Sequence, residues 1–200
     1  LKCIELSDKK SKKQGFFGPK QFKNTWNVFT HMNTTAPEFY EALKENKLPD
    51  LDVFVAGAGT GGTIMGFHHY FTNRKGFESF KAIPVFPMEN SSKSHRIEGI
   101  GDSFIPEIMD LDILEPSLRV KDSDAINIAR QINKKGLSVG ISSGANVYAA
   151  IKMANENKDG SIIGTILCDG NKKYLSTDLC SYTEEKLSID IEIKDFSRIA

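Results

Sequence analysis

The sequence has no long apolar run and no excess of charge of either sign. No stretch approaches the roughly 18 apolar residues of a membrane-spanning helix, and the lysine-rich start is not followed by the apolar core of a signal peptide. We therefore expect no membrane partner. Basic and acidic residues both number 26, so the formal net charge is zero. Such a balance gives no electrostatic reason to expect a nucleic-acid partner.

Cysteine is also scarce. Cys3, Cys168 and Cys180 are odd in number and lack the spacing of a zinc site. This pattern favours unpaired thiols in a reducing compartment, the cytoplasm, and we expect no metal site. Cys168 ends an apolar segment, so the sequence predicts that it is buried as a small apolar residue.

Apolar segments alternate along the chain with helical patterns. Three segments are apolar almost throughout, as buried strands of a parallel sheet are: 51–56, 82–86 and 161–168. Apolar residues recur at helical spacing in three further segments: 63–72, 123–136 and 147–154. The sequence therefore predicts an α/β fold, in which helices cover both faces of a mostly parallel sheet.

Shorter signals mark the remaining segments. Residues 2–6 predict a short strand, and the lysine-dense "SDKKSKKQG" after them predicts a solvated loop. Thr35 and Glu38 have the spacing of a capping box, which predicts the start of a helix. Residues 137–141 are expected to be extended, and the alternating isoleucines of 188–194 predict an edge strand.

A glycine-rich turn lies between the first apolar strand and its helix. The stretch "VFVAGAGTGGTIMG", residues 53–66, contains five glycines and two threonines. Open α/β sheets bind ligands at the carboxyl ends of their strands, and helix N-termini favour anions. Glycines let the backbone approach a ligand closely, and the threonine hydroxyls add donors. The sequence thus predicts that five consecutive residues hold a phosphate group: Gly59, Thr60, Gly61, Gly62 and Thr63.

The identity of the phosphorylated ligand stays open at this point. No lysine stands in the Walker A position, which disfavours a magnesium nucleotide. Gly57, Gly59 and Gly62 match G-x-G-x-x-G, and Glu89 follows the next strand where a dinucleotide fold places its ribose-binding acid. The glycines could also serve a tight turn alone. Ser142 lies at the start of another helix, where it or its neighbour would act as a cap.

Five stretches, taken in order, resemble the cysteine synthase and cystathionine β-synthase family, fold-type II enzymes that depend on pyridoxal 5′-phosphate. They are "QFKNTWNVFTHMNTTAPE" (21–38), "AGAGTGGTIMG" (56–66), "HRIEGIGDSFIPEIMD" (95–110), "GISSGANVYAAIKMA" (140–154) and, less closely, "CDGNKKYLST" (168–177). The resemblance implies a fold like that of the tryptophan synthase β subunit. It also implies a remnant of the smaller N-terminal domain at 1–33, a large cofactor-binding domain at 34–180 and a tail at 181–200.

The same resemblance implies a role for each site residue. Residues 59–63 would hold the cofactor's phosphate, and the hydroxyl of Ser142 would meet the pyridine nitrogen. A hydroxyl partner leaves that nitrogen largely neutral, which suits β-replacement. Gln21 would lie near the substrate carboxylate, and Gly99 and Gly101 would line the substrate side of the cofactor.

The implied activity is β-replacement on O-acetylserine or serine, through an aminoacrylate, with sulfide or a thiol as the incoming group. The resemblance also implies a small amino-acid substrate and a homodimer. In the family the Schiff-base lysine lies in an N-terminal part to which no stretch of this chain corresponds, so we assign no catalytic residue. Glu98 stands where glutamine is common. A module that binds a cofactor or a partner without catalysis remains an alternative.

Overall fold

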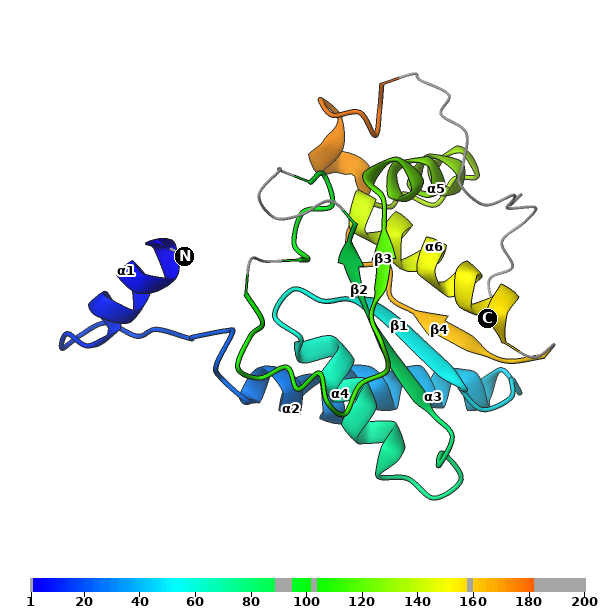
Figure 1. Ribbon diagram of the computed structural model, residues 1–200, viewed down its shortest axis with the longest axis horizontal. Coiled ribbons are helices and arrows are strands. Elements are labelled where there is room, and N and C mark those ends of the chain that lie inside the picture. The colour runs from blue at the N-terminus through cyan, green and yellow to red at the C-terminus, as the bar shows by residue number, and fades with distance from the viewer. Residues whose placement is uncertain (1, 89–94, 102–103, 158–159, 182–200) are drawn as a thin grey trace.

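A four-stranded parallel sheet forms the centre of the molecule (Figure 1). The computed structural model describes residues 2–88, 95–101, 104–157 and 160–181. The strands are β1 (Val53–Gly57), β2 (Lys81–Pro87), β3 (Leu118–Val120) and β4 (Ile163–Thr165), in the order β3-β2-β1-β4. All three neighbouring pairs are parallel. The predicted α/β class and parallel sheet are confirmed.

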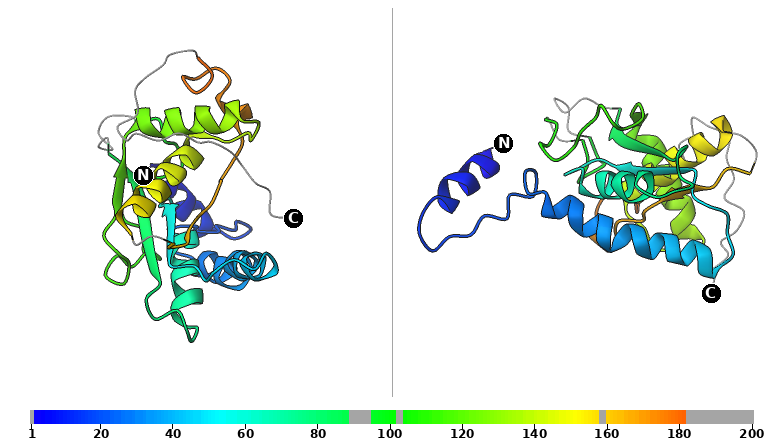
Figure 2. Two further views of the ribbon diagram at one scale, coloured as in Figure 1. Left: turned by 90° about the vertical axis from the view of Figure 1, so that its right-hand side faces the viewer. Right: turned by 90° about the horizontal axis from the view of Figure 1, so that it is seen from below.

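Helices cover both faces of this sheet, as predicted (Figure 2). They are α1 (Lys2–Ser11), α2 (Trp26–Asn33), α3 (Thr35–Glu45), α4 (Gly62–Thr72), α5 (Asp122–Lys134), α6 (Ile141–Glu156) and the 3₁₀ turn η1 (Asn171–Tyr174). Helices α3 and α4 pack on one face together with α2, while α6 packs on the other face beneath α5. Each face therefore has its own apolar core.

Strand β1 separates the two cores because its side chains alternate between the faces. Val53 and Val55 belong to the core beneath α5 and α6. Phe54 belongs to the core beneath α4, where its ring stacks on Phe67 with 3.6 Å between the ring centroids. All four side chains are at most 1% exposed. The strand is thus apolar on both sides, as the uninterrupted apolar run predicts.

The prediction of a strand at residues 2–6 is wrong, because this segment belongs to helix α1. The helix also includes the first half of the expected loop, as far as Ser11. Glu5 in its first turn and Lys9 and Lys10 in its last turn suit the helix dipole. Helix α1 stands away from the main body (Figure 1), and none of its ten described residues is buried. A helix satisfies its own backbone hydrogen bonds there, whereas a strand would need a neighbour.

The predicted capping box is also wrong, although helix α3 begins where it was expected. Thr34 is the cap residue and forms no side-chain cap bond to α3, whose residues are all described. Its hydroxyl donates instead to the Thr30 carbonyl in α2, at 2.8 Å. The Thr35 hydroxyl is 2.9 Å from His31 Nδ1. Helix α2 ends at Asn33, directly before Thr34. Both threonine hydroxyls therefore bond to residues of α2 and not to the start of α3.

Three short segments differ from the long elements in how far the sequence predicts them. Residues 137–140, all within the described part of the chain, form neither strand nor helix, and Ile141 begins α6. The Asn133 side chain holds this connection through both backbone groups of Val139, at 2.7 and 3.1 Å. Strand β3 was not predicted, because only three residues form it. The expected edge strand at 188–194 lies outside the described residues.

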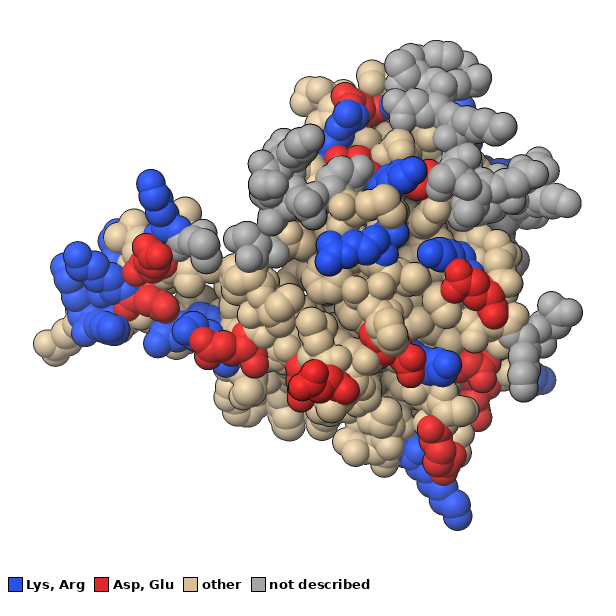
Figure 3. Space-filling view, in the orientation of Figure 1, with Lys and Arg blue, Asp and Glu red and all other residues tan. Residues whose placement is uncertain are grey.

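The face drawn in Figure 3 carries charged side chains of both signs. Figure 3 shows acidic and basic side chains interspersed over one face, with basic ones gathered around α1. Among the helices of the described residues, none is both long and apolar enough to pass through a bilayer.

Candidate functional site

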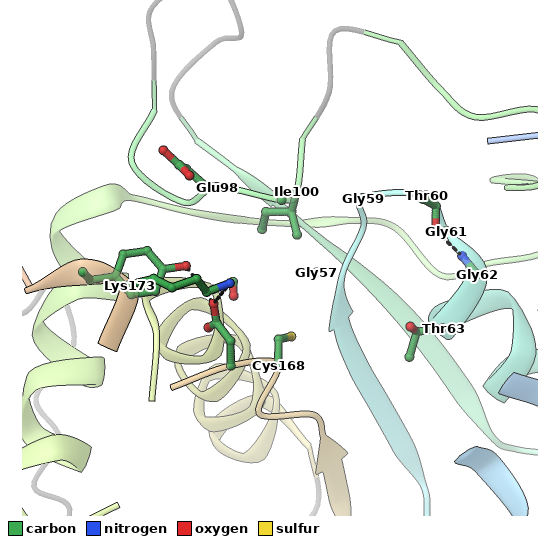
Figure 4. Close-up of a pocket in the computed structure, with 14 residues that line it drawn as sticks. Gly57, Gly59, Thr60, Gly61, Gly62, Thr63, Glu98, Ile100, Cys168 and Lys173 are labelled. Atoms are coloured by element: carbon green, nitrogen blue, oxygen red, sulfur yellow. Dashed lines mark hydrogen bonds and ion pairs between the residues drawn. The ribbon is translucent and has the colours of Figure 1, made fainter. Parts of the chain in front are cut away.

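A cavity of about 490 Å³ opens at the carboxyl ends of β1 and β4. Residues 59–63 lie along one side and Cys168 lies along the other (Figure 4), and Ser142 also lines the cavity. Gly99 also lines it, whereas Gln21 and Gly101 are not among its lining residues. The structure therefore brings the glycine turn and the serine of α6 to one cavity, although they are about 80 residues apart in sequence.

The turn between β1 and α4 requires its glycines. Gly61 is the cap residue of α4 and has φ 85°, a left-handed conformation that glycine adopts without strain. A Cβ on Gly59 would lie 2.2 Å from the carbonyl oxygen of Gly99. The first amides of a helix have no partner within the helix, and the dipole makes that end positive. The turn therefore offers donors to an anion in the cavity.

Asn27 supports this turn from α2, a contact that sequence reasoning missed. Its Nδ2 donates to Thr60 Oγ1 at 2.9 Å and to the Gln21 carbonyl at 3.1 Å. Gln21 is thus connected to the turn through its backbone. Asn27 lies within the stretch 21–38 that carries the resemblance, but no local pattern marks an asparagine as a partner of a residue 33 positions away.

His31 supports the last residue of the turn. Its Nε2 lies 3.4 Å from Thr63 Oγ1, and its Nδ1 lies 2.9 Å from Thr35 Oγ1. Burial lowers the pKa of His31, which favours the neutral ring. A neutral imidazole has one donor and one acceptor nitrogen, so each threonine hydroxyl has a complementary partner. The histidine therefore orients Thr63 rather than adding a charge to the cavity.

The opposite side of the cavity is formed by the start of α6 and the chain after β4. Ser142 is 6% exposed, and its hydroxyl lies near enough to the thiol of Cys168 to lower the pKa of that thiol. Ser143 Oγ accepts the Cys168 backbone N–H at 2.9 Å. The prediction that Cys168 is buried is wrong: β4 ends at Thr165, and the thiol beyond it is exposed at the cavity. Partial removal from water nevertheless raises the pKa of the Cys168 thiol, and the nearby Ser142 hydroxyl opposes this shift.

Three charged or phenolic side chains form a cluster beside Ser142. Asp169 Oδ2 forms an ion pair with Lys173 Nζ and accepts a hydrogen bond from the Tyr174 hydroxyl, each at 3.0 Å. Burial, together with the bond to Asp169, raises the pKa of Tyr174 to about 12. The carboxylate is thus engaged by a cation and a neutral phenol. Sequence reasoning did not identify this cluster, because 168–177 matches the family pattern only weakly.

Two glycines connect the turn to the segment that follows β2. Gly99 has φ 88° and lines the cavity. Gly101 has φ 74°, and its N–H donates to the Ala58 carbonyl at 3.0 Å. Glu98 also lines the cavity, on the side away from the turn (Figure 4).

The cavity lies at the carboxyl edge of a parallel sheet and is lined by a serine and by the amides and hydroxyls of a helix N-terminus. These features define a class of site that suits a phosphorylated ligand. Residues 2–169 match the family model described as "Pyridoxal-phosphate dependent enzyme", and the chain belongs to this family. The family match favours pyridoxal phosphate over the dinucleotide that the glycine pattern left open. Glu89, the proposed ribose ligand, lies outside the described residues.

Three relatives illustrate the similarity. Cysteine synthase B of Campylobacter jejuni is 40% identical over 169 residues, a match that covers 82% of this chain and 54% of the relative. The crystal structure of a hydrogen sulfide-producing enzyme from Fusobacterium nucleatum has a TM-score of 0.84 and 38% identity, over 91% of this chain and 56% of that one. The crystal structure of an O-acetylserine dependent cystathionine β-synthase from Helicobacter pylori has a TM-score of 0.75 and 34% identity. This match covers 89% of this chain and 57% of that one. The chain spans about half the length of the curated relatives it matches.

Proposed function

We propose that this chain is the cofactor-binding part of a cysteine synthase-like enzyme, which replaces the β-substituent of O-acetylserine or serine with sulfide or a thiol. The observation that carries the proposal is that residues 59–63 and Ser142 line one cavity of about 490 Å³. The names of the relatives support the same reaction class. We expect a homodimer in the cytoplasm, acting on a small amino acid.

The chemistry of the cavity fits pyridoxal phosphate at both ends. Amides and hydroxyls of 59–63 would hold the phosphate, while His31 and Asn27 fix the two threonine hydroxyls of the turn. The Ser142 hydroxyl would face the pyridine nitrogen without giving it a proton. When bound, the cofactor supplies the electron sink for bond breaking at the substrate's α-carbon. Asp169 also lines the cavity: its Oδ2 contacts Lys173 and Tyr174, while its Oδ1 is buried without a hydrogen-bond partner among the described residues.

The substrate would bind on the side of Gly99. This glycine lines the cavity, and the bond from Gly101 to Ala58 fixes the segment against the turn. Gln21 would contact the substrate carboxylate, and Asn27 connects its backbone to Thr60. We assign no catalytic residue, and we propose that the lysine that bonds the cofactor belongs to the N-terminal part of the longer relatives. The division into 1–33, 34–180 and 181–200 remains part of this proposal.

Titration of the 200-residue chain with pyridoxal phosphate tests cofactor binding, with cofactor fluorescence as the readout. We expect saturable binding that Ser142→Ala weakens and that NAD does not compete away. Ser138→Ala is the matched control, because this hydroxyl bonds Asn171 and does not line the cavity. Saturable binding of NAD without binding of pyridoxal phosphate would contradict the proposal.

Cysteine formation from O-acetylserine and sulfide tests the reaction. We expect little turnover by the chain alone and a gain when the N-terminal segment of a related cysteine synthase is joined to it. Borohydride reduction of the joined protein should fix the cofactor to a lysine of the added segment. Fixation to Lys173, the lysine that lines this cavity, would show that our assignment of the lysine is wrong.

A further inference from the structure

Asn146 lies beneath the cavity and contacts both of its sides. The residue is fully buried, with 0% exposure. Its Oδ1 accepts the Gly57 N–H at 2.8 Å, at the end of β1. Its Nδ2 donates to the Ile166 carbonyl at 2.8 Å and lies 3.6 Å from Cys168 Sγ. One amide group therefore joins the chain after β1 to the chain after β4.

The position of this amide coincides with the point where two strands separate. Strand β4 pairs with β1 from Val53 to Val55, and the last rung is Val55 with Thr165. Strand β1 continues to Gly57, and its other edge stays paired with β2 over that length. A side-chain amide has the donor and acceptor of a peptide group. Asn146 therefore replaces the backbone partner that β4 no longer provides at Gly57.

The same residue is connected to the serine of the site. Ser142 and Asn146 are four residues apart on α6, so they lie on the same face of the helix. Gly57 precedes the turn by two residues, and Ser142 and Cys168 line the same cavity. The amide thus fixes the glycine turn, the start of α6 and the chain after β4 relative to one another. A buried amide that lost one partner would be costly, so this arrangement is well defined.

We propose that Asn146 is a positioning residue, which sets the separation between the phosphate-binding turn and Ser142. The inference rests on the proposed function, because a ligand that spans both ends is what makes the separation matter. Pyridoxal phosphate would contact both ends of the cavity, whereas inorganic phosphate would contact the turn alone. Loss of Asn146 should therefore weaken the first ligand more than the second.

The test compares the two ligands on the unmodified chain and on Asn146→Ala. We expect Asn146→Ala to weaken pyridoxal phosphate binding about tenfold more than phosphate binding, since two hydrogen bonds that align the two ends are lost. Asn133→Ala is the matched control, because this asparagine also bonds one N–H and one carbonyl, those of Val139, and does not line the cavity. It should weaken both ligands equally.

A conservative variant keeps the proposal testable if Asn146→Ala unfolds. In Asn146→Asp at about pH 5, burial favours the protonated acid, which can accept from Gly57 and donate to Ile166. At that pH, this variant should keep the preference of the unmodified chain for pyridoxal phosphate over inorganic phosphate, and loss of that preference would contradict the inference. Equal weakening of both ligands by Asn146→Ala, or a selective loss in Asn133→Ala, would overturn the inference. Failure of the unmodified chain to bind pyridoxal phosphate would overturn the proposed function as well.

Discussion

Substitution of Gly59 by alanine tests whether this glycine is required for ligand binding as well as for the fold of the turn. The new Cβ would lie 2.2 Å from the Gly99 carbonyl oxygen, and ordinary contact begins at 3.4 Å, so the turn or the segment at Gly99 must move by about 1.2 Å. Overpacking of this kind costs about 1–3 kcal/mol of folding free energy. The same shift would stretch the hydrogen bonds to a bound phosphate, and losing two of them weakens binding about 100-fold.

Two measurements on Gly59→Ala test this reasoning. Urea unfolding gives the change in stability, and titration with pyridoxal phosphate gives the change in affinity. Gly76→Ala is the control: Gly76 has φ 96° with open space around its Cα, beyond the other end of α4. It should lose about 1–2 kcal/mol through backbone strain, with unchanged affinity. A folded Gly59→Ala chain that binds pyridoxal phosphate as tightly as the unmodified chain would refute the reasoning.

Three further predictions concern titratable groups. Folding raises the pKa of Tyr174 from 10.0 to about 12. The stabilisation that this shift provides is present in full below pH 10 and should be lost as the pH rises towards 12. Urea titrations of Tyr174→Phe should not show this loss. Burial lowers the pKa of His31 below 6.5, so the chain should lose stability as the pH falls below 6.5. This loss, measured by unfolding above and below pH 6.5, should be smaller in His31→Gln. Pyridoxal phosphate should slow maleimide labelling of Cys168, at the cavity, but not of Cys3, on α1; equal protection would place the ligand elsewhere.

The sequence predicts those parts of the fold that are long and uniform in pattern. Apolar runs predict the strands β1 and β2, because a strand buried on both faces is apolar almost throughout. Apolar residues at helical spacing predict the helices α4, α5 and α6. Segments that bury little are harder to predict. Helix α1 has no buried residue, and β3 pairs over only three residues, so neither leaves a pattern that distinguishes helix, strand and loop.

The candidate site divides in the same way. The turn at 59–63 is visible in sequence, because positive φ and close backbone approach require glycine. Its supporting side chains are not visible, since Asn27, His31 and Asn146 each contact the turn or its preceding strand from 32 to 89 positions away. Cys168 shows the limit most directly: its place after an apolar run predicts burial, but the strand ends three residues earlier.

The two ends of the cavity belong to different layers of the fold, and each layer is fixed at a point of very close packing. On the turn side, a Cβ on Gly66 of α4 would lie 2.9 Å from the backbone nitrogen of Met32 in α2. On the serine side, a Cβ on Gly144 of α6 would lie 2.0 Å from the Ala125 carbonyl in α5. These approaches set how far each helix stands from its neighbour, and hence where each end of the cavity lies. Packing outside the cavity therefore helps to determine its length, and Asn146 connects the two layers where they meet.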